Sequence, residues 1–414
     1  MGERTGRGTP DTLDRWAFRL LAAGMLTFAF SMLLGQITMG GALLLALLAA
    51  VRRRRRPGSH GVVWLMLVFA AIAVMTAVWG ANPEKGVSKL PRLAWWLGIP
   101  AAILLVDTTE RLLAVLRAFM AGCCILAAEI CVVRPIGALR GGDGSFIDRV
   151  IDAGSMTDGQ MLVLGLVVAA MLIDLRARRG ERATWEFAAL LLQGAGLLLN
   201  FKRGSWGCVA LVLGAFLVIR LKRRGLVLLI VIALAAVALP PVRQRLGNLG
   251  EQFDVNSGFR ATMWLRVAPG LIKDHPWGVG YGALTNKMME EYSWRVEPSR
   301  DHLHSNVLQV LAETGWAGLV VYLLWMAKAV LDGIGFARGA GGASVEERTG
   351  ALCLLLMLAG LLLNGIVEYN FGDTELLVVA AVIMGAARAG RLRCANAVTI
   401  GRVGTSIGRL AQTG

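Results

Sequence analysis

Long apolar stretches separated by short polar connections run through most of the chain. Two of the clearest are GGALLLALLAAV at residues 40–51 and GLVLLIVIALAAVALPP at residues 225–241. Runs of about 20 residues with few charges are typical of transmembrane helices. Because lipid offers the backbone no hydrogen-bond partners, such segments satisfy their own peptide groups by forming helices. The pattern therefore predicts an all-α, polytopic membrane protein.

Twelve apolar segments are predicted as transmembrane helices. Several are shorter than an ideal span, so about ten to thirteen spans are compatible with the pattern. The segments cover residues 16–35, 37–51, 60–81, 93–106, 113–133, 156–175, 185–200, 205–221, 225–241, 316–337, 350–368 and 374–390. Nine fall within residues 1–241 and three within residues 316–390. Residues 242–315 form a long connection expected to contain short helices, and residues 391–414 form a tail.

Composition agrees with this class, since 56% of the 414 residues are hydrophobic and only 17% are charged. A soluble domain has about 25% charged residues, so soluble and disordered classes are excluded. The formal net charge is +15. In a soluble protein such a basic balance would suggest nucleic acid, but in a membrane protein it reports orientation.

Four clusters of basic residues fall on the same side of the membrane in the twelve-span arrangement. They are residues 52–56; Arg176, Arg178, Arg179 and Arg182; Arg220, Lys222, Arg223 and Arg224; and Arg388, Arg391 and Arg393. Positively charged connections are retained in the cytoplasm, which predicts that both termini are cytoplasmic. The excess of positive charge lies on that side, so no nucleic-acid partner is expected.

The six cysteines give no sign of a disulfide or metal framework. Five lie in predicted spans and one in the predicted cytoplasmic tail. No disulfide is expected from these positions, and no CxxC pair or metal-ligand cluster is apparent, so no metal or cofactor is predicted. Asp143 and Asp148 are the alternative ligands for a cation. The first apolar segment is too long for a cleavable signal peptide, and a second follows closely.

The long connection at residues 242–315 concentrates polar chemistry on the outer side. Three of the four histidines lie there, His275, His302 and His304. A connection of this length commonly carries a function. Its DHPWGVGYG segment, residues 274–282, predicts a rigid turn between two helical stretches.

Helical spacing flanks this turn on both sides. Arg260, Trp264 and Val267 recur at intervals of four and three residues, so they share one helix face. After the turn, DHLHSNVLQVLAETGWAGL predicts a helix capped by Asp301, with His304 in its first turn. A surface or capping role is the alternative for this histidine, but the nearby outer arginines favour a functional one.

The FKRGSW segment, residues 201–206, places Lys202 and Arg203 at the outer end of a span. Positive charge in a very short outer loop departs from the topology rule. Snorkelling is the alternative explanation for Lys202. The Arg203–Gly204 pair suggests close approach to an anion, because the guanidinium fork matches phosphate oxygens. Several outer arginines around one cavity would hold a diphosphate without a metal.

Three segments resemble the O-antigen ligase and polymerase superfamily of bacterial envelope membrane proteins. FKRGSW is similar to its Arg-Gly-Ser element. FRATMWLRVAPGLIKDHPWGVGYGAL, residues 259–284, is similar to its Arg-x₃-Trp helix and His-Pro-x-Gly-x-Gly-x-Gly turn. HSNVLQVLAETGWAGL resembles its last element, which here comprises His304, Leu308, Glu313, Gly315, Gly318 and Leu319. The match covers residues 201–319, and His304-Ser305-Asn306 departs from the His-Asn or His-Ser-Asp of many relatives.

The resemblance implies a glycosyltransferase in the bacterial inner membrane whose active site faces the periplasm. Its donor would be a glycan on undecaprenyl diphosphate, and no nucleotide would be needed. For a ligase, the acceptor would be a sugar hydroxyl of lipid A–core. Both substrates are anchored in lipid, which accounts for a chain that is nearly all membrane.

Residue chemistry then suggests roles within that reaction. His304 is the expected general base for the acceptor hydroxyl. Arg203 and Arg260 are the expected catalytic diphosphate clamp, with Lys202 and Arg266 as further diphosphate-binding residues, because fixed cations stabilise the charge that develops on a leaving group. One base and direct displacement predict inversion at the anomeric carbon, and no paired carboxylates indicate a retaining route.

Three alternatives remain at the level of sequence. A polymerase would extend a lipid-linked glycan. Polymerases usually have more than one large outer connection, whereas this chain is predicted to have only one, which favours a ligase. A protein O-glycosyltransferase commonly has a large C-terminal periplasmic domain, whereas this tail is short. A transporter or flippase also fits twelve spans, yet Glu129 and Asn364 are nearly the only polar mid-span candidates. The sequence leaves open whether the 134–155 connection reaches the site.

Overall fold

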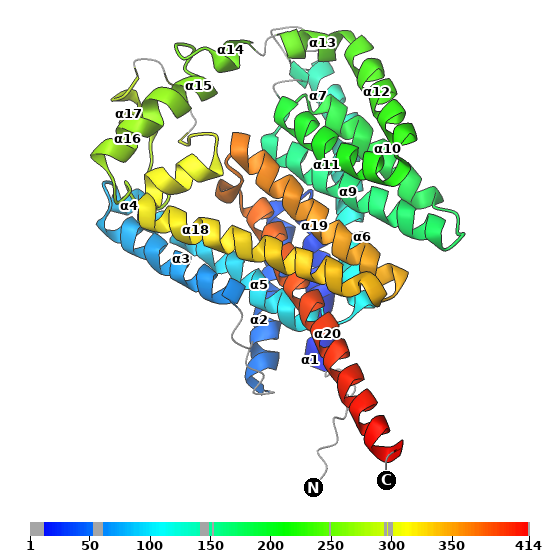
Figure 1. The fold of residues 1–414 in the computed structure, drawn as a ribbon. Coiled ribbons are helices and arrows are strands. Elements are labelled where there is room, and N and C mark those ends of the chain that lie inside the picture. The colour runs from blue at the N-terminus through cyan, green and yellow to red at the C-terminus, as the bar shows by residue number, and fades with distance from the viewer. Residues whose placement is uncertain are drawn as a thin grey trace.

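The computed structural model describes residues 12–52, 61–140, 149–150, 153–247, 250–293, 296 and 301–412. The alternative cation ligands Asp143 and Asp148 lie outside these residues, as does most of the arginine run that begins at Arg52. The described residues form helices joined by turns and contain no strand, which confirms the all-α prediction. Figure 1 shows these helices in one bundle.

The first half of the chain forms the elements from α1 to α10. They are α1 Thr12–Thr27, α2 Met32–Arg52, α3 Gly61–Trp79, α4 Pro83–Lys89, the 3₁₀-helix η1 Leu90–Leu97, α5 Gly98–Leu105, α6 Thr109–Ala128, the π-helix η2 Glu129–Val133, α7 Arg134–Arg140, α9 Met156–Arg178 and α10 Thr184–Leu199.

The second half includes the predicted long connection and the last membrane helices. Its elements are α11 Arg203–Leu221, α12 Arg223–Ala238, α13 Pro240–Gly247, α14 Gly250–Phe253, α15 Arg260–Thr262, the π-helix η3 Met263–Val267, α16 Ala268–Asp274, α17 Asn286–Glu290, α18 Asn306–Gly339, η4 Ala340–Gly342, α19 Val345–Val367, η5 Asn370–Gly372 and α20 Thr374–Gln412. The short helices α14–α17 lie within the predicted connection, as expected.

Each of the twelve predicted spans falls largely on helix, but the number of membrane crossings is not fixed at twelve. Among the described residues, seven helices are long and apolar enough to cross a membrane. The count becomes eight if α12 and α13, which meet at an angle of 89°, form one broken span. α10 is apolar but has only 16 residues. The chain is therefore a polytopic membrane protein, and its described residues contain fewer full-length spans than the twelve predicted apolar segments.

The first helical hairpin turns earlier than predicted. The pattern placed spans at 16–35 and 37–51, whereas α1 ends at Thr27 and α2 begins at Met32. The apolar character continues through this turn, so hydropathy could not locate it. Packing does, because a Cβ on Gly35 would approach the Phe28 ring to 2.5 Å, so the glycine makes room for this ring.

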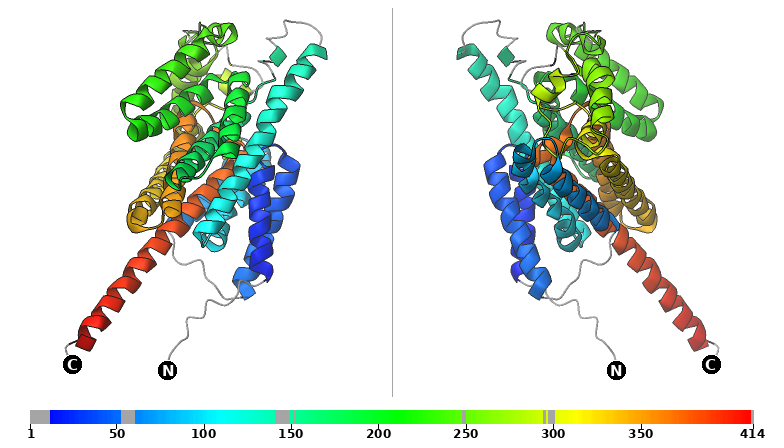
Figure 2. Two further views of the ribbon diagram at one scale, coloured as in Figure 1. Left: turned by 90° about the vertical axis from the view of Figure 1, so that its right-hand side faces the viewer. Right: turned by 90° about the vertical axis from the view of Figure 1, so that its left-hand side faces the viewer.

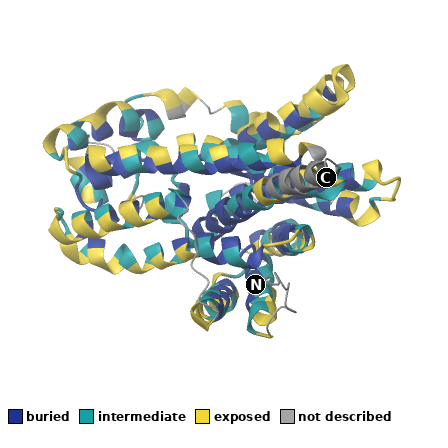
Figure 3. Cartoon of the chain, turned by 60° about the horizontal axis from the view of Figure 1, so that its bottom comes forward, coloured by how far each residue is buried: buried dark blue, intermediate teal, exposed yellow. Residues whose placement is uncertain are grey.

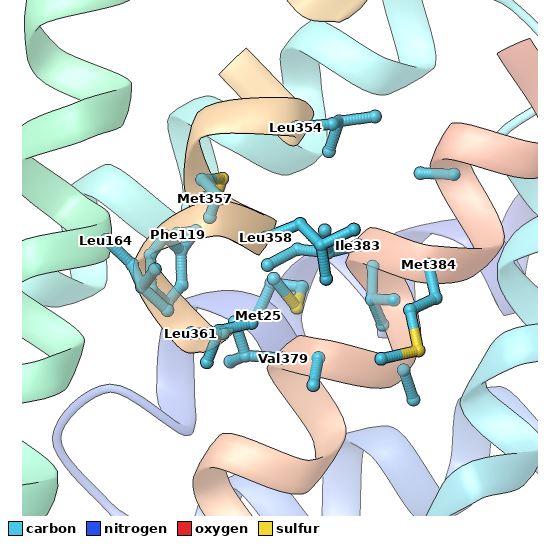
Figure 4. Close-up of a cluster of buried hydrophobic side chains, with 14 of the residues drawn as sticks. Met25, Phe119, Leu164, Leu354, Met357, Leu358, Leu361, Val379, Ile383 and Met384 are labelled. Carbon is cyan, nitrogen blue, oxygen red and sulfur yellow. The ribbon is translucent and has the colours of Figure 1, made fainter. Parts of the chain in front are cut away.

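α9 and the first half of α20, residues 374–390, are largely enclosed in the bundle. α9 contacts α6, α10, α11 and α19, and α20 contacts α5, α18 and α19. A helix that is apolar all round is typical of such an interior position. Figure 4 shows where Met25, Phe119, Leu164, Leu358 and Ile383 meet in the core between them. Exposed residues lie along the outer faces of the helices (Figure 3), and many of the exposed apolar residues belong to α12.

Ion pairs tie several helix ends together at one end of the bundle. Arg179 after α9 pairs with Glu346 of α19, and Arg220 of α11 binds Asp174 of α9 at 2.8 Å. Arg391 of α20 binds Asp332 of α18 at 2.8 Å. Three of the predicted basic clusters therefore lie at the same end. Figure 2 shows the start of α1 and the end of α20 on the side away from the elements near residue 250.

Candidate functional site

His304 lies immediately before α18 and not in its first turn, as the sequence suggested. The helix begins at Asn306, with Ser305 at the N-cap position. His304 has a φ of 49°, in the left-handed region that few non-glycine residues adopt. The prediction that Asp301 caps this helix is wrong. Asp301 instead binds the Lys85 ammonium group at 2.8 Å and accepts a hydrogen bond from the Asn286 backbone.

Side-chain hydrogen bonds delay the start of the helix. The Leu303 N–H donates to Gln309 Oε1 at 2.7 Å, and the Leu303 carbonyl accepts from Trp264 Nε1 at 2.9 Å. Such bonds compete with the helical ladder for backbone groups. They hold the segment before His304 against the Arg260–Val267 stretch, which links the two outer motifs of the sequence.

Glu368 joins His304 to Arg260. It follows the last residue of α19, and its two carboxylate oxygens have different partners. His304 Nδ1 lies 3.0 Å from Oε1, while Arg260 Nη2 donates to Oε2 at 2.6 Å. Arg260 Nε also donates to the Val367 carbonyl at 3.0 Å. The structure thus brings together two predicted site residues through an acid that the sequence analysis did not select.

The charge on Glu368 is set by these partners. Burial by itself would raise the pKa of its carboxyl group. The hydrogen bond from His304 and the charges of His304, Arg260 and His302 outweigh burial and lower the pKa to about 2. An ionised carboxylate only accepts hydrogen bonds, so the proton of the neutral imidazole belongs on Nδ1 and Nε2 is the basic nitrogen.

Glu368 and His302 line a cavity of about 490 Å³. Its walls come from α4 and η1, from the start of α9, and from the segments on either side of α17, together with Lys202 and residues near η5. The lining contains Lys85, Lys89, Arg92, Lys202, Asp301, Glu313 and Asp373. Burial raises the pKa of Asp373, whose carboxylate accepts a hydrogen bond from Thr157 at 2.6 Å. The cavity is highly polar and carries charges of both signs.

The predicted diphosphate-binding residues occupy different positions around this cavity. Lys202 lines it. Arg203 begins α11 outside the lining, and its Nη1 donates to the Arg245 carbonyl at 2.9 Å. Arg266 is exposed in η3 and is also outside the lining. Of the predicted residues, Arg260 contacts Glu368 and Lys202 lines the cavity, whereas Arg203 and Arg266 lie outside the lining.

The glycine-rich turn fits into a break in α18. Gly315, with a φ of 65°, interrupts the helix. The N–H groups of Val279 and Gly280 donate to the Ala312 and Glu313 carbonyls at 2.8 and 3.0 Å. Gly278 has a φ of 89°, and a Cβ there would collide with Glu313. The turn therefore binds helix carbonyls next to the break in α18, which links the glycine-rich turn and the Glu-x-Gly element structurally.

His302, His304 and Glu368 also present ligand atoms within 4.8 Å of one another, a grouping that the sequence spacing did not reveal. Both oxygens of Glu368 already contact His304 and Arg260. A cation placed there would face the Arg260 guanidinium, so the arrangement suits proton transfer better than metal binding.

Sequence reasoning missed Glu368 and the cations of α4 and η1. Glu368 is the last residue of the predicted 350–368 span, and an acid that ends an apolar stretch on the outer side is the signal that could have found it. Lys85, Lys89 and Arg92 belong to a short connection, predicted to be external, that carried no recognisable spacing. Tertiary contacts bring these three residues to the cavity that Glu368 also lines.

Comparison with known proteins finds one matching family model. Residues 187–323 match the family model described as O-Antigen ligase, which represents membrane enzymes of a glycosyltransferase type. No curated protein matches the chain. The matched segment includes Lys202, Arg203, Arg260 and His304, whereas Glu368 and the α4–η1 cations lie outside it. Over this segment, about a third of the chain, the protein is similar to the O-antigen ligase and polymerase superfamily.

Proposed function

We propose that the protein is an O-antigen ligase that transfers a glycan from undecaprenyl diphosphate to a sugar hydroxyl of lipid A–core. In the proposed reaction, the acceptor oxygen attacks the anomeric carbon while its proton passes to His304 Nε2. The bond between the anomeric carbon and the phosphate oxygen breaks, and undecaprenyl diphosphate leaves with the electron pair. The configuration at the anomeric carbon is inverted.

The contact between His304 Nδ1 and Glu368 is the observation that carries this proposal. A carboxylate that stays ionised orients the imidazole and stabilises the imidazolium formed when Nε2 accepts a proton. Both side chains are largely buried, at 4% and 6% exposure. Burial strengthens their interaction, since few waters screen it.

Cations near the same pair support a diphosphate leaving group. Arg260 contacts Glu368, and Lys202 lines the adjoining cavity. Arg203 lies in the first turn of α11. This turn is close to the end of α19: a Cβ on the next residue, Gly204, would be 3.8 Å from Val367. Prearranged cations of this kind stabilise developing negative charge without a metal ion. We assign Arg266 a weaker, longer-range contribution because it is exposed.

A ligase is favoured over a polymerase by the single large outer segment between α12 and α18. The contacts of the two polar mid-span residues, Asn364 and Glu129, do not favour the transporter alternative. Asn364 lies 3.4 Å from Asn370, whose amide donates to the Leu361 carbonyl, and Glu129 lies 3.8 Å from Arg134. These groups serve helix packing and helix ends, not a polar path through the bundle. The proposed location is the inner membrane, with this site facing the periplasm and both termini in the cytoplasm.

Reconstitution tests the proposed reaction directly. Purified protein in lipid vesicles, supplied with lipid-linked glycan and lipid A–core, is expected to produce glycan-extended lipid A–core. His304→Ala should abolish transfer, whereas His275→Ala, in the same outer segment, should retain it. Full transfer by His304→Ala would overturn the general-base role, and longer lipid-linked glycan without core modification would identify a polymerase.

A chelator tests the proposed metal independence in the same assay. EDTA is expected to leave the rate unchanged. Loss of activity with EDTA that a divalent cation restores would contradict this part of the mechanism.

A further inference from the structure

The cavity beside Glu368 contains a second group of cations that the proposed diphosphate clamp does not use. Lys85 and Lys89 belong to α4, and Arg92 belongs to η1. All three line the cavity together with Lys202. They come from a different part of the chain from Lys202, Arg203 and Arg260, so the site has cations on two separate structural elements.

The three cations differ in their contacts with the protein. Lys85 Nζ binds Asp301 at 2.8 Å and the Leu284 carbonyl at 2.6 Å. Within the described part of the chain, the side chains of Lys89 and Arg92 form no hydrogen bond or ion pair, and both are half-buried. A partly desolvated cation without a partner is unfavourable, and a bound anion would offset that cost.

The acidic residues of the cavity are bound elsewhere. Asp301 binds Lys85, and Glu368 binds His304 and Arg260. Asp373 accepts from Thr157, and Glu313 accepts from Gln309 at 2.8 Å. Arg92 acts on Asp373 through its charge but does not contact it. Among the residues that the structure describes, no carboxylate therefore contacts Lys89 or Arg92.

Local packing holds these two cations at the cavity. The stem of Lys89 lies against Gly282, the last glycine of the glycine-rich turn, where a Cβ would be 2.7 Å from Lys89 Cβ and Cγ. Gly282 has a φ of 65°. Asn82 Oδ1 accepts from the Lys85 N–H at 3.2 Å and caps α4. The same turn that packs against the break in α18 therefore also provides the space that Lys89 occupies.

We propose that Lys89 and Arg92 form an anion subsite for the acceptor, where they bind a phosphate or carboxylate group of the acceptor glycan. The inference rests on the proposed glycosyl transfer. An inverting displacement requires the acceptor oxygen and the leaving diphosphate on opposite sides of the anomeric carbon. The two ionic groups then need separate cations, which these separate elements provide. Holding the acceptor anion at Lys89 and Arg92 orients a nearby hydroxyl towards His304.

Steady-state kinetics with each substrate varied in turn tests the subsite. For the Lys89→Ala/Arg92→Ala double variant, the acceptor KM is expected to rise at least about tenfold, given the strength of charged hydrogen bonds. The donor KM should stay unchanged. Lys287→Ala, which removes an exposed cation from α17, should leave both constants unchanged. The charge-retaining Lys89→Arg/Arg92→Lys variant should recover most of the loss.

A modified acceptor provides a second test of the subsite. Acceptor stripped of its phosphate and carboxylate groups should raise the wild-type KM to a similar extent, with little further loss in the double variant. A raised donor KM, or an acceptor KM unchanged in the double variant while the wild type transfers glycan, would overturn the subsite. A double variant whose thermal unfolding matches wild type ensures that its kinetic loss is not a folding defect. If the wild type transfers no glycan at all, the proposed function fails, and the subsite fails with it.

Discussion

His304 combines an unusual backbone with a specific side-chain partner. Its left-handed conformation persists because Leu303 is held by Gln309 and Trp264 on one side and α18 starts directly after Ser305. Residues in sparsely populated backbone regions cluster at functional sites, where surrounding contacts over-determine them. The conformation directs the imidazole towards Glu368 at the end of a different helix.

Glu368→Gln tests the positioning role of this carboxylate. The amide keeps the size of the side chain but removes its charge, and its NH₂ group can face Nδ1 and favour the wrong imidazole tautomer. We expect kcat to fall about 10²- to 10⁴-fold with a smaller change in KM. Measured kcat and KM for this variant, with exposed Glu290→Gln as the matched control, check the expectation. Wild-type kcat in Glu368→Gln would contradict it.

The same variant carries a pH signature. The native pKa of Glu368 is about 2, below its usual value of 4.5. A lowered carboxyl pKa stabilises the fold fully above about pH 4.5, and this contribution is lost as pH falls towards 2. The free energy of unfolding should therefore decline less between pH 4.5 and 2 in Glu368→Gln than in wild type. Equal declines in the two proteins would show that the ionised carboxylate adds no stability.

The residues that sequence reasoning found are those with local patterns. His304 and Arg260 lie in recognisable motifs, and the structure links them. Glu368 is 64 residues from His304, and Lys89 is further still, so no local spacing relates them to the histidine. The prediction that Asp301 caps α18 was wrong for a related reason. Lys85, which is distant in sequence, binds the Asp301 carboxylate.

At the scale of elements, the break in α18 and the glycine-rich turn form one unit. The predicted 316–337 span begins directly after Gly315, so hydropathy located the second part of α18 well. The preceding helical pattern was also recognised. What the pattern could not reveal is that the two parts join at a left-handed glycine whose neighbouring carbonyls bind the turn.

Gly315→Ala is expected to destabilise this unit. A Cβ there would lie 2.6 Å from the Trp277 carbonyl carbon and 2.7 Å from the Pro276 oxygen, with a φ of 65°. Backbone strain alone costs about 1–3 kcal/mol, and the contact with backbone atoms adds to it. Thermal unfolding in detergent should show a lower Tm. Gly341→Ala, which meets no atom within 4 Å, is the control and should have a Tm near wild type. Equal Tm values for the two variants would contradict the close-packed unit.

At the scale of the whole molecule, the bundle has two chemically different ends. One contains the ion pairs of Arg179, Arg220 and Arg391, and the other contains the cavity and His304. Hydropathy predicted the helices because burial in lipid selects for apolar runs. Among the described residues it marked more segments than the seven or eight helices long enough to cross a membrane, because short helices such as α10, with 16 residues, are also apolar.

Site-directed labelling tests the orientation of these ends. In a variant whose six native cysteines are replaced, Lys287→Cys should react with a membrane-impermeant maleimide added to spheroplasts. Gly341→Cys, at the opposite end, should react only after the membrane is permeabilised. This result follows from the retention of arginine-rich connections in the cytoplasm. The reverse labelling pattern would place the cavity in the cytoplasm and exclude the proposed lipid A–core acceptor.

α19 is fixed at both of its ends. Its first turn carries Glu346 and Glu347, which bind Arg179 and Arg393, and Glu368 follows its last residue. Adding or deleting one residue between them would rotate Glu368 by about 100° and shift it by about 1.5 Å along the axis. Either change would remove the carboxylate from His304 Nδ1. The number of residues in this helix is therefore part of the site's geometry, and changes in chain length can be absorbed only in the connections outside it.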